Sequence, residues 1–213
     1  YSISLYQRSS GGHFNFEKNL SPIPILSEQN EYGNQYYTES QGKEKINGAE
    51  VLIRRKNHLI NGWISYHFNQ TKYSFPNINN GKLYNADHDL RHEFKSVLVT
   101  SILNWDITAS WSYSSGRVFT HEDDINKTND FQIIFDLDSR NKQMLPPIHH
   151  LDLSISKMYK LKKFEVNTGL SIYNIYNRKN ISHKRYNPYT SGKILSNVIM
   201  LGTTPTIFIE VKI

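Results

Sequence analysis

Apolar and polar residues alternate along most of this chain with a period of two. In "WDITASWSYSS", from Trp105 to Ser115, apolar residues stand at every second position, with Asp, Thr or Ser between them. This period is typical of a β-strand whose two faces meet different surroundings, whereas an amphipathic helix repeats every 3.6 residues. No stretch of the chain has a convincing helical period, so the sequence predicts an all-β protein.

The alternation divides the chain into eight predicted strands. They cover residues 1–8, 47–56, 59–75, 90–103, 105–115, 149–161, 164–180 and 195–213. The breaks at residues 57–58, 104 and 160–163 are tight, and those at 9–43, 76–89, 118–145 and 186–193 are long. Tight turns at one end of a sheet and long loops at the other are typical of a transmembrane antiparallel β-barrel.

Either a second sheet or lipid could cover the apolar faces. The polar faces favour lipid, because they hold small hydroxyl residues that suit a wet or plug-filled lumen. These residues are Thr108, Ser110, Ser112, Ser114, Ser154 and Ser156. Aromatic residues near strand ends match interfacial girdles: Trp105, Tyr113, Tyr66, Phe68, Tyr159 and Phe164. Glu165, Glu210 and Lys212 are predicted on the lumen side; two glutamates in a dry apolar core would exclude a barrel.

Composition narrows the possibilities further. The 213 residues are 38% hydrophobic, with a mean hydropathy of −0.58, and contain no apolar run long enough for a transmembrane helix. The formal charge is +6, but Lys and Arg gather near strand ends, which predicts a solvated rim and no nucleic-acid binding. The first residues already follow a strand pattern, without a signal peptide, so we expect the chain to begin inside a longer protein.

Three polar clusters resemble catalytic or metal sites. In "NADHDLRHEF", His88 and His92 have the spacing of helical zinc ligands, but at a loop–strand junction we expect the Asp residues to turn the chain and Arg91 to pair with an acid. "THEDD" at 120–124 lacks the spaced oxygens of a calcium loop. His150 should face the lumen beside Asp152, in a structural hydrogen bond. Without a nucleophile elbow, phosphate loop or Cys nucleophile, we expect no enzyme, no cofactor and no metal site.

Several segments together carry a family resemblance. The most specific are "DLRHEF", "LPPIHHLDLSISK", and "YNIYNRKN" from Tyr173 to Asn180, which we interpret as opening the penultimate strand. With "ASWSYSSGRVFT" and the terminal "TPTIFIEVKI", they resemble the C-terminal part of a TonB-dependent outer-membrane receptor of the Bacteroidetes type. The resemblance covers nearly all of residues 1–213 except the loops. The final residue departs from it, because Ile213 stands where such receptors usually end in an aromatic.

The resemblance implies a fold, a function and partners. The chain would be a fragment holding roughly the last eight strands of a 22-stranded barrel in the bacterial outer membrane. The N-terminal plug and the TonB-contacting segment would lie outside it. Such receptors bind a scarce nutrient (siderophore, haem, cobalamin or oligosaccharide) and import it with TonB-relayed energy. The alternatives are a passive outer-membrane channel or structural barrel protein, and a secreted β-sandwich glycan-binding module.

Ligand recognition is expected in the long loops, because loops on a rigid scaffold carry binding residues. The loops at 9–43 and 118–145 are the main candidates. The aromatic residues that could stack on a sugar or chelate are Tyr36, Tyr37, Tyr84, Tyr186 and Tyr189. Ordinary packing in the loops or the aromatic belt explains the same residues, and the sequence leaves the ligand open.

Overall fold

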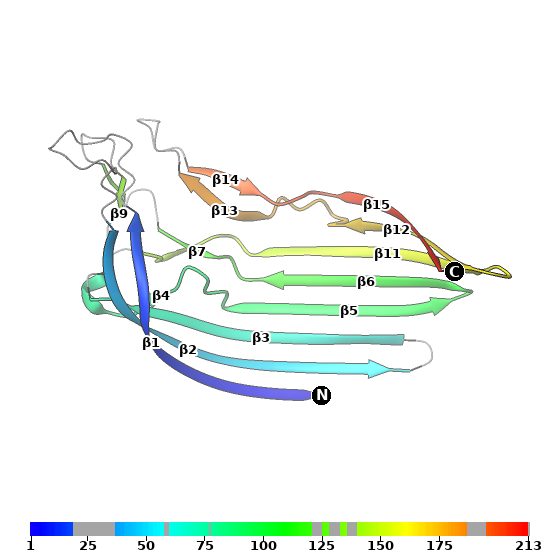
Figure 1. Cartoon of the computed structure of the whole chain (residues 1–213), viewed down its shortest axis with the longest axis horizontal. Helices are drawn as coiled ribbons and strands as arrows, with labels where there is room; N and C mark the ends of the chain where they lie inside the picture. The colour runs from blue at the N-terminus through cyan, green and yellow to red at the C-terminus, as the bar shows by residue number, and fades with distance from the viewer. Residues whose placement is uncertain are drawn as a thin grey trace.

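An antiparallel meander forms the body of the protein in the computed structural model (Figure 1). The structure describes residues 1–18, 37–57, 60–76, 78–120, 125–127, 133–135, 140–186 and 195–212. The eight long strands lie in the order β1-β2-β3-β5-β6-β11-β12-β15, with β4 paired to β3. The predicted all-β class is confirmed, and each of the eight predicted strands overlaps one long strand of the sheet. The prediction of a continuous strand at 195–213 is wrong, because residues 195–199 pair in a separate sheet and the strand of the main sheet begins at Thr204.

The main strands are β1 (Ser2–Lys18), β2 (Tyr37–Lys56), β3 (Ile60–Ser74), β5 (His92–Ile102), β6 (Trp105–Ser114), β11 (Ile148–Lys160), β12 (Glu165–Tyr173) and β15 (Thr204–Lys212). The short elements are η1 (Asn79–Gly81), β4 (Tyr84–Asn85), β7 (Val118–Phe119), β8 (Ile125–Lys127), β9 (Ile133–Phe135), β10 (Gln143–Met144), β13 (Ile181–Tyr186) and β14 (Leu195–Ile199). β7 pairs with β10, β8 with β9, and β13 with β14.

The register of the sheet brings the predicted apolar positions onto one face. On β6, Ala109 stands opposite Leu98 of β5 and Leu153 of β11, and Leu153 stands opposite Ile172 of β12. Because paired residues point to the same side of a sheet, the apolar face continues from strand to strand. The run "VLV" at 97–99, whose orientation the sequence left open, sends Leu98 to the apolar face and its two valines to the polar face.

The connections also follow the predicted alternation. Tight turns join β2 to β3, β5 to β6 and β11 to β12 at one end, and longer connections join the other pairs at the opposite end. Leu103 and Asn104 both have positive φ, of 52° and 65°, as a type I′ hairpin requires. Both chain ends lie at the tight-turn end of the sheet (Figure 1).

The long connections contain more β-structure than the sequence predicts. The expected loop at 9–43 is wrong at both ends, because β1 continues to Lys18 and β2 begins at Tyr37. A bulge between Gly11 and His13 interrupts the register there, and Gly12 takes a φ of 76°. A bulge breaks the period of two and bends the strand, which hid this part of β1 from pattern analysis. β7 with β10, and β8 with β9, likewise lie within the expected loop at 118–145.

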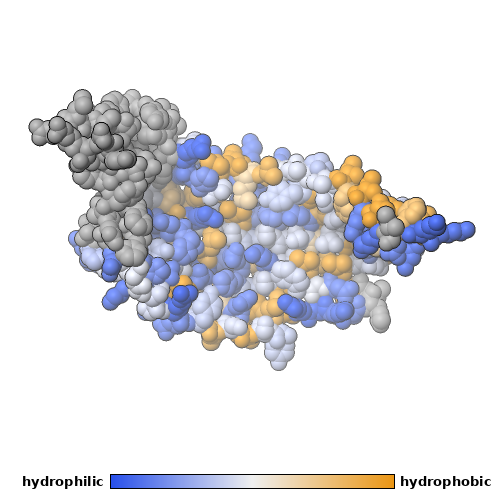
Figure 2. Space-filling model, in the orientation of Figure 1, coloured by the Kyte–Doolittle hydropathy of each residue, from blue (hydrophilic) through white to orange (hydrophobic). Residues whose placement is uncertain are grey.

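The sheet is open and has a single layer within the described ranges. Its edges are β1 and β15, which do not pair with one another, and the strands in contact are those joined in ladders. The apolar face is therefore left bare: Leu98 is 46% exposed and Ile207 is 79% exposed. In the view of Figure 2, hydrophobic residues gather over the ends of β12 and β15. No helix among these residues is long and apolar enough to span a membrane.

Aromatic rings cover glycines on the polar side of the sheet. Tyr6 lies over Gly48, and Phe208 lies over Gly169, where added Cβ atoms would overlap the rings. A Cβ on Gly169 would also stand 2.7 Å from the carbonyl oxygen of Ile155 on the neighbouring strand. The rings supply the contacts that a glycine in a strand lacks, and they hold the register of neighbouring strands.

Replacing Gly169 with Ala should destabilise the sheet by about 1–3 kcal/mol, because the ring and the backbone must both move. Gly11→Ala is the matched control, since no atom lies within 4 Å of the added methyl group. Urea unfolding of both variants in detergent micelles measures the difference in stability. Equal unfolding midpoints would contradict the close packing of Gly169.

Candidate functional site

The apolar face carries an aromatic band near the long loops. It consists of two neighbouring groups of rings, one on β3 and β5 and one from β5 through β6 and β11 to the turn after β12, and within each group the contacting centroids are 5.3 to 6.5 Å apart. The members are Tyr66, Phe68, His92, Phe94, Trp111, Tyr113, His149 and Tyr176. Three of these rings, Tyr66, Phe68 and Tyr113, are among the aromatic residues predicted near strand ends. The other five were not predicted there, and the two histidines among them carry no strong strand or interface signal.

A second, smaller group lies on the same face beside the tight turns. The ammonium of Lys157 lies 5.1 Å from the ring centroid of Trp105 and 5.5 Å from that of Tyr159. Trp105 and Tyr113 are separated along β6 by about 26 Å at 3.3 Å per residue. The two aromatic groups therefore bracket an apolar zone close to the ~25 Å height of a membrane barrel's lipid-facing band.

The polar face carries a row of hydrogen-bonded groups. The hydroxyl of Tyr6 lies 2.6 Å from Nε2 of His67, and Nδ1 of His67 lies 3.6 Å from Glu93. Glu165 and Glu210 are also on this side, each within 4 Å of a lysine ammonium and each about half exposed. Neither glutamate lies in a dry apolar core, so the condition that would have excluded a barrel is not met.

His150 and Asp152 adopt the predicted pairing. Nδ1 of His150 donates to Oδ1 of Asp152 at 2.9 Å, and Nε2 lies 2.8 Å from the hydroxyl of Ser112. The order Ser–His–Asp is that of a nucleophilic triad, which also needs free N–H donors for an oxyanion. Ser112 pairs with both neighbouring strands. Because the ladder uses its N–H, this N–H is not free to stabilise an oxyanion.

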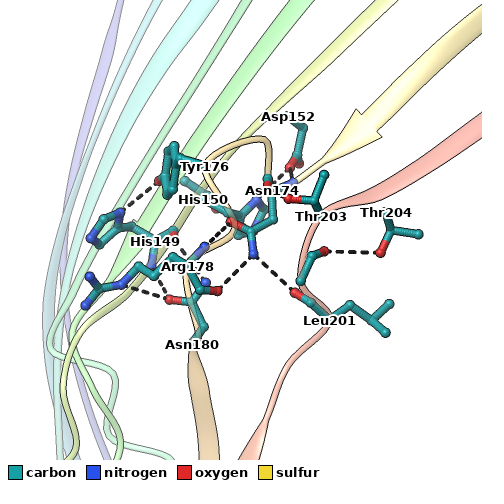
Figure 3. A network of polar contacts seen from close by, with 12 residues as sticks. His149, His150, Asp152, Asn174, Tyr176, Arg178, Asn180, Leu201, Thr203 and Thr204 are labelled. Carbon is teal, nitrogen blue, oxygen red and sulfur yellow. Dashed lines mark hydrogen bonds and ion pairs between the residues drawn. The ribbon is translucent and has the colours of Figure 1, made fainter.

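Two motifs that are distant in sequence meet beyond the end of β12 (Figure 3). "LPPIHHLDLSISK" supplies His149 and Asp152, and "YNIYNRKN" supplies Asn174 and Asn180. Asn180 accepts a hydrogen bond from the N–H of His149 and donates to its carbonyl, at 3.2 and 2.9 Å. The N–H of Asn174 donates to Oδ1 of Asp152 at 2.8 Å. The expectation that "YNIYNRKN" opens a strand is wrong: it ends β12 and turns the chain.

Asn174 joins this turn to the connection before β15. Its side chain is fully buried, and its Nδ2 donates to the carbonyls of Arg178 and Leu201 at 2.9 and 3.2 Å. Its Oδ1 accepts the N–H of Arg178, and its carbonyl accepts the hydroxyl of Thr203. Asn174 has a φ of 49°, which Asn tolerates better than most residues. The turn therefore ties β11, β12 and β15 together.

A small core lies at the long-loop end, and it contains Tyr84. Phe75, Ile78 and Tyr84 are buried there, with the ring of Tyr73 against them. Asp89 is buried beside this core; it accepts the N–H of Thr71 at 2.9 Å and pairs with Arg91 at 2.9 Å. The predicted pairing of Arg91 with an acid at this junction is confirmed.

A buried carboxylate faces two imidazoles next to the same core. Glu44 lies 3.7 Å from Nε2 of His13 and 3.5 Å from Nε2 of His88. Burial and the carboxylate of Glu44 raise the pKa of Tyr73, so its hydroxyl stays protonated at neutral pH. Among the described residues, no group of three acidic, His or Cys side chains has the arrangement of a metal site.

The structure does not gather the five predicted ligand-binding tyrosines. Tyr84 is 7% exposed and packs in the loop core. Tyr37 begins β2 and Tyr186 ends β13, but only their backbone is described. Tyr36 and Tyr189 lie outside the described residues, as do 121–124 of the "THEDD" segment. Ligand binding by these tyrosines stays a prediction.

Comparison with known proteins adds no relative. Neither the protein-family models, nor the curated proteins, nor the solved structures yield a match to this chain. The geometry of the sheet and the motifs within it are therefore the basis of a functional proposal.

Replacing Asn174 with Gly should lower the free energy of unfolding by about 2–3 kcal/mol, since two buried carbonyls and one N–H lose their partner while the positive φ is kept. Asn79→Gly is the matched control, because Asn79 also has a positive φ, of 52°, at a half-buried turn. Urea unfolding in micelles measures both variants. A loss at Asn174 no larger than that at Asn79 would contradict the role of this turn.

Proposed function

We propose that this chain forms part of the wall of a β-barrel in the bacterial outer membrane, and that the barrel is an active transport receptor. The membrane location is supported by the apolar face, which continues across the strands between two aromatic groups and is not covered by any of the described residues. Soluble monomers rarely expose apolar patches beyond a few hundred Å². Lipid is the cover that fits both the apolar zone and the aromatic groups at its edges.

A secreted β-sandwich is a poorer explanation. It requires a second sheet against the apolar face, and the described strands make a single layer. In a sandwich, the polar face with Glu93, Lys95, Glu165 and Glu210 would be the solvent-exposed outer surface, so these charges do not separate the two folds. In a barrel, the same charges line a polar interior.

Active transport rests on the resemblance to TonB-dependent receptors; two of its three most specific motifs, "LPPIHHLDLSISK" and "YNIYNRKN", meet in the turn after β12. Further strands of the same protein would pair with the free edges of β1 and β15 and close a 22-stranded barrel around an N-terminal plug. The loops at the β13–β14 end would face outward and bind a scarce nutrient, and TonB would supply energy through the plug. The tight turns would be periplasmic.

Spin labels at Ala109 and Ser110 test the orientation of the sheet. These neighbours are both small and lie on opposite faces of β6, and the chain has no cysteine of its own. In outer membranes that contain the natural gene product with one introduced cysteine, the label at Ala109→Cys should collide with oxygen from the lipid and be shielded from aqueous nickel chelate. The label at Ser110→Cys should lack this lipid signature. A label at Ala109 that is shielded from both reagents would indicate a second sheet and overturn the proposal.

Conductance separates a receptor from a passive channel. A plugged receptor in a planar bilayer should be silent, whereas a passive channel carries a steady current through its lumen. A gene that encodes a plug domain upstream of Tyr1 should accompany the silent result. A steady current from the complete gene product would overturn the receptor and favour a channel.

A further inference from the structure

A hollow of about 220 Å³ lies on the polar face where β6, β11 and β12 run side by side. It exists because small residues stand opposite one another: Ser154 of β11 pairs with Thr108 of β6 and with Ser171 of β12. Asp152 pairs with Ser110 one step along the same strands. The result is a floor of four hydroxyl groups beside one carboxylate, with Leu153, Ile172 and Tyr173 also in the lining.

The carboxylate of Asp152 is held in place by one oxygen only. Oδ1 accepts hydrogen bonds from Nδ1 of His150 at 2.9 Å and from the N–H of Asn174 at 2.8 Å. Oδ2 has no hydrogen-bond partner among the described residues, and the side chain of Asp152 is about 30% exposed to solvent. The turn after β12 therefore fixes the carboxylate and leaves a free acceptor beside the hollow.

The charge of the hollow is not balanced by the described part of the chain. His150 is the only basic residue there whose side chain lies within 4 Å of Asp152. Hydroxyl oxygens accept hydrogen bonds as well as donate them, and an aromatic ring such as that of Tyr173 attracts cations. A single negative charge among acceptors favours a positively charged donor over a neutral or anionic group.

We propose that this hollow binds an ammonium or guanidinium group. Its volume is below the 300–1,000 Å³ typical of sites that enclose a whole ligand, so it takes one group of a larger molecule. The group can belong to a transported solute or to a Lys or Arg side chain of the same protein outside the described residues. The inference rests on the proposed function only in requiring that the polar face meets the water-filled or plugged lumen.

Charged thiol reagents measure the preference at Ser154. Ser154→Cys is introduced alone into the natural gene product in outer-membrane vesicles, and its reaction rates with a cationic and an anionic methanethiosulfonate of similar size are compared. Because the carboxylate of Asp152 attracts the cationic reagent and repels the anionic one, the cationic reagent should react about tenfold faster. The ratio should fall towards one in the double variant with Asp152→Asn, which keeps the shape of the side chain.

Ser156→Cys is the control for charge without a hollow. Ser156 lies on the same face, opposite Asp106, and is not part of the lining. Its rate ratio should not change with Asp152→Asn. Propylammonium or propylguanidinium should slow the reaction at Ser154 and not at Ser156, while propanol slows neither. Ser171→Val, which fills the hollow without altering its charge, should abolish this protection and provides a second test if Asp152→Asn fails to fold.

The outcomes also distinguish the two sources of the group. Protection by the added amine identifies a free solute. A Ser154→Cys that reacts with neither reagent until Asp152 becomes Asn identifies a side chain of the protein. Measurable and equal rates for the two reagents with Asp152 intact, rates unchanged by Asp152→Asn, or equal protection by propanol would overturn the inference. Loss of lipid contact at Ala109 would defeat the proposed function and leave the rate ratio at Ser154 unaffected.

Discussion

The two faces of the sheet need different surroundings, apolar on one side and polar on the other, and the other features of the structure follow from this constraint. Hydrogen bonds in the ladders satisfy the backbone of every internal strand, so the strands need no further polar partner. Their side chains divide into an apolar face that no described residue covers and a polar face with paired charges. In water, this apolar surface would drive association of the protein; in lipid, it needs no cover.

The turn at Asn174–Asn180 extends this organisation at the long-loop end. Where β11, β12 and β15 diverge, their ladder hydrogen bonds end, and the buried side chains of Asn174 and Asn180 make hydrogen bonds between the segments instead. The partners in these bonds are backbone groups, and the N–H of Asn174 donates to the carboxylate of Asp152. Arg178 adds a hydrogen bond to the carbonyl of Pro147. The segment before β11 is thus tied to the segment after β12, which explains why the two motifs occur together. The same turn fixes Asp152 beside the hollow.

The fold could be predicted from the sequence better than the site, and the reasons are physical. Strands such as β6 and β11 were predictable from their pattern, because lipid or core on one side and water on the other impose a period of two on residues such as Ile107 and Ile155. The extension of β1 past Gly12 was not, because a bulge shifts the period there.

Site geometry was predictable only between residues close in sequence. Asp152 lies two residues from His150 on β11, so their contact followed from alternation. The pairing of Arg91 with Asp89 followed from the acids beside it at the loop–strand junction. The contacts of Asn174 with Leu201 and of Glu44 with His88 cross between distant segments, and no local pattern encodes them. The burial of Tyr84 depends on Phe75 and Ile78 folding back over it, which again required the tertiary structure.

Fluorescence quenching by brominated lipid is the most direct measurement of what covers the apolar face. The chain has three tryptophans: Trp105 and Trp111 are on the apolar face, and Trp63, opposite Val97 and Arg54, is on the polar face. In vesicles of the natural gene product, Trp111→Phe should remove fluorescence that the brominated lipid quenches, and Trp63→Phe should remove fluorescence that it does not. Quenching that is lost equally in both variants, or in neither, would contradict a lipid-covered face.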